Sequence, residues 1–464
     1  MQRIPALCAL LVVGFFAGPF AAGCPEQDEG PDPTGAPLAV VYVDDIGDDQ
    51  EGSGRQSDPY RSLATAIAKA KDGSLIKILE GIHVAVPVDD VDPTCGNCNA
   101  IDFAAEQIDV KVAWAIRGKG LHLEGASRTE TVLTTNAGYG LYFDGAGPSS
   151  VKNLTITGGV RSANGRATDA GIVVKSTQLD IANVDIVGND NVYPGEPDPI
   201  VGIMGVALRE GADATVTGCR VENNSWDGIS LYRSDPDVPN SWPRATIIGN
   251  IVGCTRNCVN PAGRGVGIAT TWDSEAVVVG NRVHHMWKGI GTFGESTMIA
   301  ANNAVIDQVG WGMIASSTGI SDFTNNVIAR NGTTGLAAWS SGAEGSFINN
   351  IVVANGTSAD EWVGKKTGLW VNSTKVVIAY NNVSGNASFD VCSGGTPNET
   401  PCAPVDLDES NLATSPLFAD STTFTLQDAS PLKDQGDPAI LDVDGSRSDM
   451  GLWGGPHADE NAAP

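Results

Sequence analysis

Between Val279 and Ala354 one four-residue phrase occurs four times: GNRV at 280–283, NNAV at 302–305, NNVI at 325–328 and NNIV at 349–352. Its second position falls at 281, 303, 326 and 350, so the phrase returns after 22, 23 and 24 residues. A second phrase, glycine followed by an aliphatic residue, lies between the copies at 289–290, 312–313 and 335–336. Repeats of this length without helical periodicity predict a solenoid built from short strands.

The same two phrases extend through most of the chain. The asparagine column continues, with longer steps where loops are inserted, at Asn153, Asn183, Cys219, Asn250 and Asn382. The glycine column runs from Gly140 to Gly368. The aliphatic residue after each glycine and the residue two places later alternate onto one face, so both are expected to point inward. The sequence therefore predicts an all-β, right-handed parallel β-helix of roughly ten coils over residues 39–388.

A short helix is predicted where the chain enters the solenoid. Residues from Arg61 to Lys71 place apolar side chains at 63, 67 and 70, a helical spacing, and this helix would cover the open end of the first coil. The preceding loop contains Asp44, Asp45, Asp48 and Asp49. Their carboxylates offer oxygen ligands for Ca²⁺, although the spacing is not that of an EF-hand. A solvated acidic turn is the alternative interpretation.

Both ends of the solenoid carry recognisable patterns. The first consists of Tyr42, Val43, Asp44, Gly47, Asp48, Pro59, Ser62, Ala66, Ala70, Asp72, Gly73, Ile76, Ile78, Gly81 and His83. It resembles the start of many secreted right-handed β-helix proteins of the pectate-lyase-like superfold. The second lies in 389–464 and consists of SPLF at 415–418, SPL at 430–432, GDP at 436–438, DVDG at 442–445 and DMGLWGGP at 449–456. It resembles the closing segment of bacterial surface β-helix proteins. These resemblances imply the architecture and leave the activity open.

The N-terminus has the composition of an export signal, predicted over residues 1–23. Arg3 precedes an apolar run that is too short and too broken by Gly and Pro to span a membrane. The sequence AAGC at 21–24 resembles a bacterial lipobox, which implies a lipidated Cys24. Residues 24–38 are expected to form a disordered tether. We therefore expect an outer-membrane or cell-surface lipoprotein that meets the membrane only through its lipid. A secreted or periplasmic protein is the alternative.

Six cysteines form close pairs within single loops, and such pairs predict small disulfides in an exported chain. They are Cys95 and Cys98, Cys254 and Cys258, and Cys392 and Cys402. The CGNC motif at 95–98 also leaves redox or zinc roles open, although no second motif of this kind supports them. Cys219 stands alone in the asparagine column and is predicted to be a buried free thiol.

The composition narrows the range of partners. The formal net charge is −27, which argues against nucleic acid and against electrostatic docking on anionic membranes. The sequence contains no dinucleotide-binding glycine motif, P-loop, HExxH or GxSxG. Apart from Ca²⁺, no cofactor is predicted, and no other metal site is expected.

A further column is expected on the outside of the solenoid, four or five residues after the column glycines, with Asp273 and Glu295 next to it at six. Its candidate catalytic residues are Lys175, Arg209, Tyr232 and Arg233. Its candidate substrate-binding residues are Trp272, Asp273, Phe293, Glu295 and Trp339. Aromatic faces stack on sugar rings, and Lys and Arg on an acidic protein suit the carboxylates of an acidic polysaccharide. The alternative is that these are ordinary exposed residues.

Two functions remain open from the sequence. One is an envelope lipoprotein that binds an acidic polysaccharide, with or without cleaving it by β-elimination, which needs a base and a positive group. A second candidate set for that chemistry is His284, His285 and Lys288 beside Asp227. The other function is a non-catalytic structural or adhesive surface protein. The NTD, GHG and RIK motifs of polygalacturonase-type hydrolases, the DPHE motif of alginate epimerases and the RxPxxR motif of pectate lyases are missing.

Overall fold

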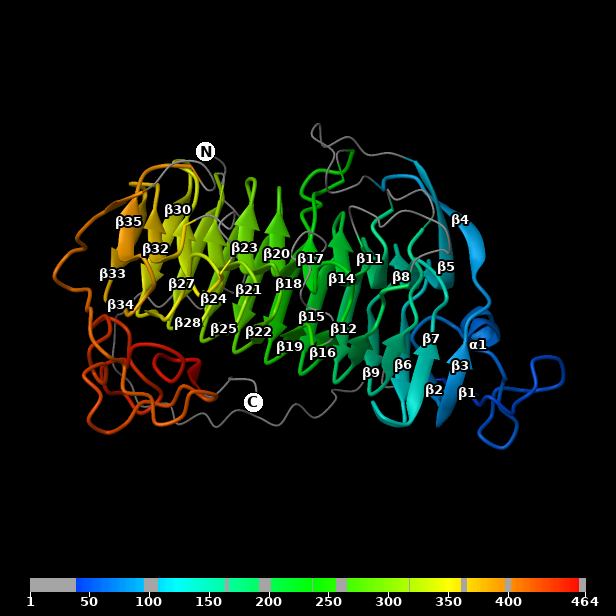
Figure 1. Cartoon of the computed structure of the whole chain (residues 1–464). Helices are drawn as coiled ribbons and strands as arrows, with labels where there is room; N and C mark the ends of the chain where they lie inside the picture. The colour runs from blue at the N-terminus through cyan, green and yellow to red at the C-terminus, as the bar shows by residue number, and fades with distance from the viewer. Residues whose placement is uncertain are drawn as a thin grey trace, which may run out of the picture. The chain divides into compact units, whose positions relative to one another are not determined.

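The computed structural model describes residues 39–458, with gaps at 96–106, 163–166, 192–201, 236, 256–264, 317, 360–364 and 397–401. Across this region the chain winds through three sheets in successive coils, which follow one another from blue to orange in Figure 1. The predicted export signal, tether and lipidated Cys24 lie outside the described residues. Among the described residues, no helix is long and apolar enough to cross a bilayer.

Each coil contributes one strand to each sheet, and the strands within a sheet are parallel except at the two ends of sheet 3. Sheet 1 contains β1 Val40–Val43, β2 Ser74–Ile78, β6 Leu121–Gly125, β9 Ser149–Lys152, β12 Gln178–Ala182, β15 Asp213–Thr217, β18 Arg244–Ile248, β21 Glu275–Val279, β24 Thr297–Ala301, β27 Ile320–Thr324, β30 Glu344–Ile348 and β33 Val376–Ala379. Sheet 2 contains β3 Gly81–Val84, β7 Thr131–Thr134, β10 Thr155–Thr157, β13 Asp185–Val187, β16 Arg220–Glu222, β19 Ile251–Gly253, β22 Arg282–His284, β25 Ala304–Ile306, β28 Val327–Ala329, β31 Ile351–Val353 and β34 Asn382–Ser384.

Sheet 3 carries most of the candidate site. It contains β4 Val88–Asp92, β5 Ile108–Arg117, β8 Tyr139–Asp144, β11 Ala170–Lys175, β14 Met204–Arg209, β17 Ile229–Leu231, β20 Val266–Thr271, β23 Lys288–Phe293, β26 Trp311–Ala315, β29 Leu336–Ala338, β32 Thr367–Val371, β35 Phe389–Ser393 and β36 Ala403–Pro404. The parallel β-helix predicted from the repeats is confirmed, and its twelve-stranded sheet 1 exceeds the predicted ten coils. The extra coils lie at the N-terminal end, before the glycine column begins.

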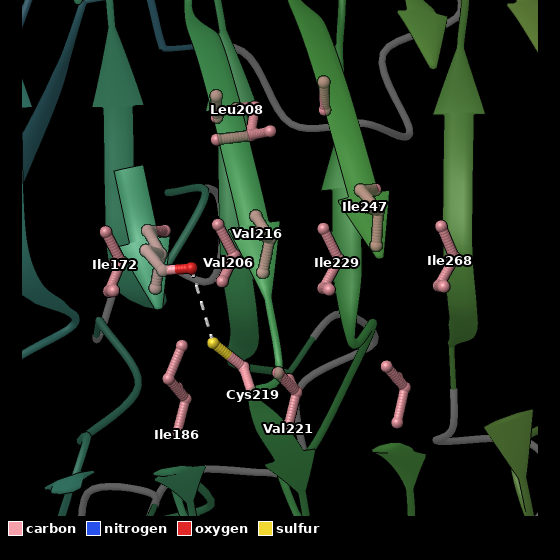
Figure 2. Packing of buried hydrophobic residues seen from close by; sticks show 14 of the residues in the cluster. Ile172, Ile186, Val206, Leu208, Val216, Cys219, Val221, Ile229, Ile247 and Ile268 are labelled. Carbon is pink, nitrogen blue, oxygen red and sulfur yellow. Dashed lines mark hydrogen bonds between the residues drawn. The ribbon is translucent and has the colours of Figure 1, made fainter. Parts of the chain in front are cut away.

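The inward columns predicted from the glycine phrase form the core. Ile172, Val206, Ile229 and Ile268 pair across neighbouring strands of sheet 3 and are fully buried. Figure 2 shows them stacked in a row, facing side chains such as Ile247 from sheet 1. Strands spaced ~4.8 Å apart place each side chain against its counterpart in the next coil. This stacked apolar interior makes the outer faces of the sheets available for other contacts.

The predicted asparagine column is a buried ladder of side-chain amides. In its centre, the Asn326 side chain accepts from Asn303 N (2.9 Å), while its Nδ2 donates to Asn350 Oδ1 (3.0 Å) and to the Ala300 carbonyl (2.9 Å). The assignment of Asn153, Asn183 and Asn382 to this ladder is wrong. Asn153 and Asn183 occupy the preceding turn position, where φ is +57° and +55°. Downstream, the ladder member is Asn381, whose Oδ1 accepts from Asn350 N (3.0 Å).

The predicted N-terminal helix is present as α1 (Leu63–Lys69), shorter than the predicted 61–71. It begins after Ser62, whose Oγ accepts from Thr65 N (3.1 Å), and it ends where Ala70 becomes extended. Leu63, Ala66 and Ile67 are buried in the core. In the preceding loop, Asp49 Oδ1 accepts from Ser62 N (2.9 Å) and from Arg61 N (3.0 Å). Asp49 therefore fastens the loop to the helix start.

The C-terminal segment does more than close the end of the solenoid. β35 extends sheet 3, and Asn411 continues the amide ladder. From Leu412 to Leu452 the chain returns along the outside of sheet 2, where Phe424, Leu432 and Met450 are buried with side chains of β25, β28 and β31. Asn302 Nδ2 donates to the Gly454 carbonyl (2.7 Å) and Asn325 Nδ2 to the Asp449 carbonyl (2.8 Å). The motifs of this segment therefore cover sheet 2 of the later coils, and they are drawn in orange and red in Figure 1.

The predicted disulfides have three outcomes. The Cys392–Cys402 bond is confirmed, with Cα atoms 5.6 Å apart. Cys254 is also disulfide-bonded, while its predicted partner Cys258 lies outside the described residues. The predicted Cys95–Cys98 bond is wrong, because Cys95 is a free, buried thiol whose Sγ lies 2.9 Å from Thr168 Oγ1. Cys98 lies outside the described residues. Cys219 is free and buried, as predicted.

Candidate functional site

The outer face of sheet 3 is built from three outward columns. One column stands directly before the glycine, where the strand pairing is interrupted, and two more follow by alternation, two and four residues after the glycine. The four-residue column contains Lys175, Arg209, Tyr232, Phe293 and Trp339, as predicted. The prediction that these side chains line one open wall is wrong. Lys175, Arg209, Tyr232 and Arg233 are all less than 7% exposed.

An arm formed by β4 and residues 93–95 covers this part of the face. β4 pairs antiparallel with β5 at the edge of sheet 3, and the arm carries Asp92 over the neighbouring coils. Asp92 accepts from Lys175 Nζ (3.1 Å), Arg209 Nη2 (2.9 Å) and the Tyr139 hydroxyl (2.9 Å). The arm also binds through Thr94, whose hydroxyl accepts from Lys175 Nζ (2.6 Å) and whose carbonyl accepts from Arg233.

Glu210 completes this ion cluster, which we define as Asp92, Lys175, Arg209, Glu210 and Arg233. Glu210 Oε2 accepts from Arg209 Nη2 (3.0 Å), and Glu210 Oε1 lies 3.6 Å from Arg233 Nε. Burial alone would raise the pKa of Asp92, but Arg209 and Lys175 hold it well below its usual range. Burial raises the pKa of Tyr139, so its hydroxyl stays protonated and donates to Asp92. The cluster fastens the arm, and its cations face protein carboxylates.

A second group lies beyond the arm, around Asp227. Asp227 stands directly before the column glycine and is 5% exposed. Its Oδ2 accepts from Ser230 Oγ (2.6 Å) and from the Tyr232 hydroxyl (2.7 Å), and its Oδ1 accepts from Val266 N (2.6 Å). Burial raises the pKa of Asp227 despite these bonds and the positive charge of Lys288. Tyr232 is therefore a partner of Asp227 rather than part of a cationic wall.

Lys288 joins the Asp227 group to the aromatic part of the face. Burial lowers the pKa of Lys288, opposed by the charge of Asp227. Its Nζ lies 5.4 Å from the ring centroid of Phe293, close enough for a cation–π interaction. The Phe293 ring lies over Gly291, since a Cβ at this glycine would stand 2.9 Å from two ring atoms. A lysine with a lowered pKa beside a carboxyl with a raised pKa is an arrangement suited to proton transfer.

Aromatic side chains continue the outer face through the later coils. We define the aromatic strip as Phe293, Trp311, Trp339 and Trp370, from four successive coils. The ring centroids of Trp311 and Trp339 lie 4.4 Å apart, and those of Trp339 and Trp370 lie 5.9 Å apart. Trp311 and Trp370 are buried, whereas Phe293 and Trp339 are half-buried. Lys365 Nζ lies 5.2 Å from the ring centroid of Trp370.

The remaining predicted site residues do not gather at the strip. Trp272 packs against Tyr232, with ring centroids 6.4 Å apart. Asp273 accepts from Ser234 N (3.0 Å), which ties it to the turn after β17. Glu295 is exposed. The second candidate set divides: Lys288 lies by Asp227, whereas His284 Nε2 lies 3.1 Å from Glu222 Oε1 on sheet 2. His285 Nδ1 lies 3.1 Å from His284 Nδ1.

The sequence analysis named Asp227 and Lys288 but did not predict that the residues directly before the column glycines form an outward column. It contains Asp227, Lys288 and Trp311, which share a register across the sheet. Strict two-residue alternation would place these residues inward, because each stands two places before an inward aliphatic residue, so periodicity alone does not predict this column. Within the part of the chain that is described, no group of three or more His, Cys, Asp or Glu side chains is arranged to hold a metal ion. In the predicted Ca²⁺ loop, Asp48 Oδ1 accepts from Gln50 N (2.7 Å) and Glu51 N (3.1 Å).

Comparison with known proteins bears on the architecture. A family model described as "Right handed beta helix region" matches residues 97–259 and 246–387. Comparison with curated proteins gives no match. Among solved structures, pectate lyase Pel9A is 15% identical, with a TM-score of 0.49 over 90% of this chain and 96% of that one. A GH136 lacto-N-biosidase from Eubacterium ramulus is 11% identical (TM-score 0.44, 81% and 68% covered), and the periplasmic alginate epimerase AlgG is 13% identical (TM-score 0.40, 62% and 75% covered).

Proposed function

Because this chain belongs to the right-handed β-helix family and displays an aromatic strip along sheet 3, we propose that it binds an acidic polysaccharide on that face. The observation that carries the proposal is the strip itself. Its two half-buried members, Phe293 and Trp339, come from coils two apart, so they stand about 10 Å apart along the solenoid, with Trp311 and Trp370 packed beneath and beside them. That is a length of about two sugar units, and half-exposed aromatic faces stack on sugar rings.

Selectivity for acidic chains is proposed to come from the cations beside the strip. Lys288 stands over Phe293 and Lys365 over Trp370, at opposite ends of the strip. They are placed on a protein whose formal net charge is −27, so negative ligands are repelled elsewhere on the surface. An ammonium group binds a uronate carboxylate through a charge-assisted hydrogen bond.

Trp339→Ala is expected to weaken binding of polygalacturonate by about fivefold to tenfold, because one stacking contact of ~1 kcal/mol is lost. Binding is measured by affinity electrophoresis and calorimetry, with neutral dextran as the comparison polymer. The control is Trp453→Ala, which removes another half-exposed tryptophan (39% exposed) from the C-terminal segment outside sheet 2. Equal weakening by both variants, or no binding of any acidic polymer, would contradict the proposal.

The Asp227 and Lys288 pair favours a second candidate function, cleavage of the bound chain by β-elimination. In this mechanism neutral Lys288 removes the C5 proton of a uronate, the C4–C5 double bond forms as the glycosidic C4–O bond breaks, and water protonates the leaving oxygen. The Tyr232 hydroxyl donates a hydrogen bond to Asp227 and holds that carboxyl beside the site. This candidate is supported by the burial of both groups and by the directions of their pKa shifts, lowered for Lys288 and raised for Asp227.

Lys288→Met is expected to reduce β-elimination at least about 100-fold, as for loss of a general base. The wild-type rate should rise with pH as Lys288 loses its proton, and it should level off below pH 10.5, the ordinary value for lysine, because its pKa is lowered. The assay follows the ultraviolet absorbance of the unsaturated product from polygalacturonate and alginate. Lys375→Met, which removes an exposed lysine paired with Glu344 on sheet 1, is the control. Wild-type protein that cleaves no uronate polymer would reject this candidate and leave the binding proposal standing.

We also propose that the protein is exported and anchored at the cell envelope by a lipid on Cys24. The support is the AAGC motif at 21–24 and the acidic, Pro- and Gly-rich stretch that follows it. Cys24→Ser is expected to release the protein from membranes into the soluble fraction, measured by fractionation and by metabolic labelling with a fatty acid. A variant that remains membrane-bound and normally processed would reject the anchor.

A further inference from the structure

A cavity of about 380 Å³ lies on the turns that lead from sheet 1 to sheet 2. It is formed by residues of β13, β16 and β19 and by the loop before β7, so it stands apart from sheet 3. Its lining consists of Arg128, Thr129, Asp185, Gly218, Cys219, Arg220, Gly249 and Ile251. The volume falls within the range of small-molecule sites.

The cavity exists because the turn column contains glycine at these coils. The position with left-handed φ is asparagine at 302, 325 and 349, where side-chain amides bind the C-terminal segment. At Gly218 and Gly249 the same position has φ of +60° and +62° and no side chain. A Cβ placed on Gly218 would meet no atom within 4 Å. In these two neighbouring coils, no side chain at the turn position covers the backbone.

Two guanidinium groups border this bare backbone, held in place by one buried carboxylate. Asp185 Oδ2 accepts from Arg220 Nη2 (2.5 Å) and Nε (3.1 Å), and Asp185 Oδ1 lies 3.4 Å from Arg128 Nη1. Arg128 Nη1 also donates to the Gly218 carbonyl (3.4 Å). Arg128 Nε and Nη2 donate to no residue of the described chain. Two positive groups and one negative group leave the lining with a net charge of +1.

The other groups near the cavity do not cancel this charge within it. Glu222 lies 3.7 Å from Arg220 Nη1, but it is also 3.1 Å from His284 Nε2 and is not part of the lining. Burial raises the pKa of the Cys219 thiol to about 11, so it is uncharged at neutral pH. The sulfur points into the core, as Figure 2 shows, and lies 3.6 Å from the Ile181 carbonyl. The lining therefore keeps the net charge of +1 that Arg128, Arg220 and Asp185 give it.

We propose that this cavity binds a small organic acid of sugar size, with its carboxylate or sulfate group held by Arg128 and Arg220. The planar guanidinium offers paired donors that match the geometry of an oxyanion. Asp185 pre-orients both groups, which lowers the entropy cost of binding. The open backbone at Gly218 and the hydroxyl of Thr129 leave room and polar contact for the hydroxyls of a sugar acid. This site does not depend on the aromatic strip.

The test uses D-glucuronate as the probe, with glucose as the neutral analogue and inorganic sulfate as a competitor, measured by calorimetry on the full chain. Arg128→Gln is expected to weaken glucuronate binding by about tenfold, the loss of one charge-assisted bond. Arg128 is chosen because its side chain is 38% exposed, so the fold should tolerate the change. Arg244→Gln removes a comparable arginine (40% exposed, paired with Glu275 on sheet 1) and should have no effect.

Gly218→Asn is a second variant that fills the cavity without straining the backbone. Asparagine occupies the same column with nearly the same φ at 302, 325 and 349, so the turn accepts it. The expected result is at least about tenfold weaker glucuronate binding at unchanged thermal stability. Trp339→Ala should leave it unchanged, which separates this site from the proposed polysaccharide face. The proposal is overturned if glucose binds as well as glucuronate, if sulfate alone binds as tightly, if glucuronate does not bind, or if Gly218→Asn has no effect.

Discussion

Replacing Asp92 with asparagine is expected to lower the free energy of unfolding by about 3–5 kcal/mol, the cost of breaking a buried ion pair from one side. Asp92 is fully buried and binds Lys175, Arg209 and the Tyr139 hydroxyl at once. Without its charge, the two buried cations share Glu210 as their carboxylate partner. The loss is measured as a shift in the denaturant midpoint at constant slope.

The dependence of the free energy of unfolding on pH, in the acidic range, provides a second test. The pKa of Asp92 is lowered in the folded protein, so its stabilising contribution is fully present above the unfolded-state value of about 4. It disappears as the pH falls towards the folded-state pKa. Stability of the variant should therefore depend less on pH below about 4. Asp89 lies on β4, as Asp92 does, and forms an exposed pair with Lys111 of β5. Asp89→Asn should therefore cost no more than about 1 kcal/mol. Equal losses for Asp92 and Asp89 would show that the cluster does not fasten the arm.

Asn326→Ala should cost about 3–4 kcal/mol, the second large effect. The substitution removes four hydrogen bonds of a fully buried amide, two made by its Oδ1 and two by its Nδ2. Asn303 N and the Ala300 carbonyl lose a partner inside the solenoid, at ~1–3 kcal/mol for each unsatisfied group. Thermal and denaturant unfolding measure the loss.

A matched asparagine outside the ladder supplies the control. Asn372 Nδ2 donates to the Trp339 carbonyl (3.0 Å) at a half-buried position on sheet 3. Asn372→Ala should cost about 1 kcal/mol, since water can replace the lost partner. If Asn326→Ala costs no more than Asn372→Ala, the ladder is a consequence of the turn rather than a source of stability.

The fold was predictable because the repeat is local and strict. Inward side chains such as Ile290 and Leu336 follow from two-residue alternation around glycine, and no distant contact changes it. The ladder was harder to assign. The turn has two adjacent positions that favour asparagine for different reasons, one for left-handed φ and one for stacking amides. A single asparagine, as at 153 or 183, does not reveal which position it occupies. A second ladder through Gln308, Asn331, Asn355 and Asn386 was missed, although each member stands five residues after a member of the first.

The sequence allowed us to predict the face of the sheet on which the site residues lie, but not how deeply they are buried. Periodicity places Lys175 and Arg209 on the outer face of sheet 3, where they lie. It says nothing about Asp92, which is 83 and 117 residues away in sequence and carries no repeat pattern. The arm that buries these cations depends on this non-local ion cluster. Lys288 was predicted as a site residue because of its charge. Its cation–π contact with Phe293 could not be predicted, because the ring takes its position over Gly291, which has no side chain.

The C-terminal segment also sets the order in which the chain can finish folding. Contacts between coils join residues about 22–50 positions apart, so coils can stack one after another as the chain is synthesised. The bonds from Asn302 to Leu452 and Gly454 span 150 and 152 positions. Until those last residues arrive, Ala304, Val327 and Ile351 on β25, β28 and β31 remain open to water and to other molecules. Closure of this segment therefore follows the stacking of the coils that it covers, and a chain cut before it would expose an apolar face prone to aggregation.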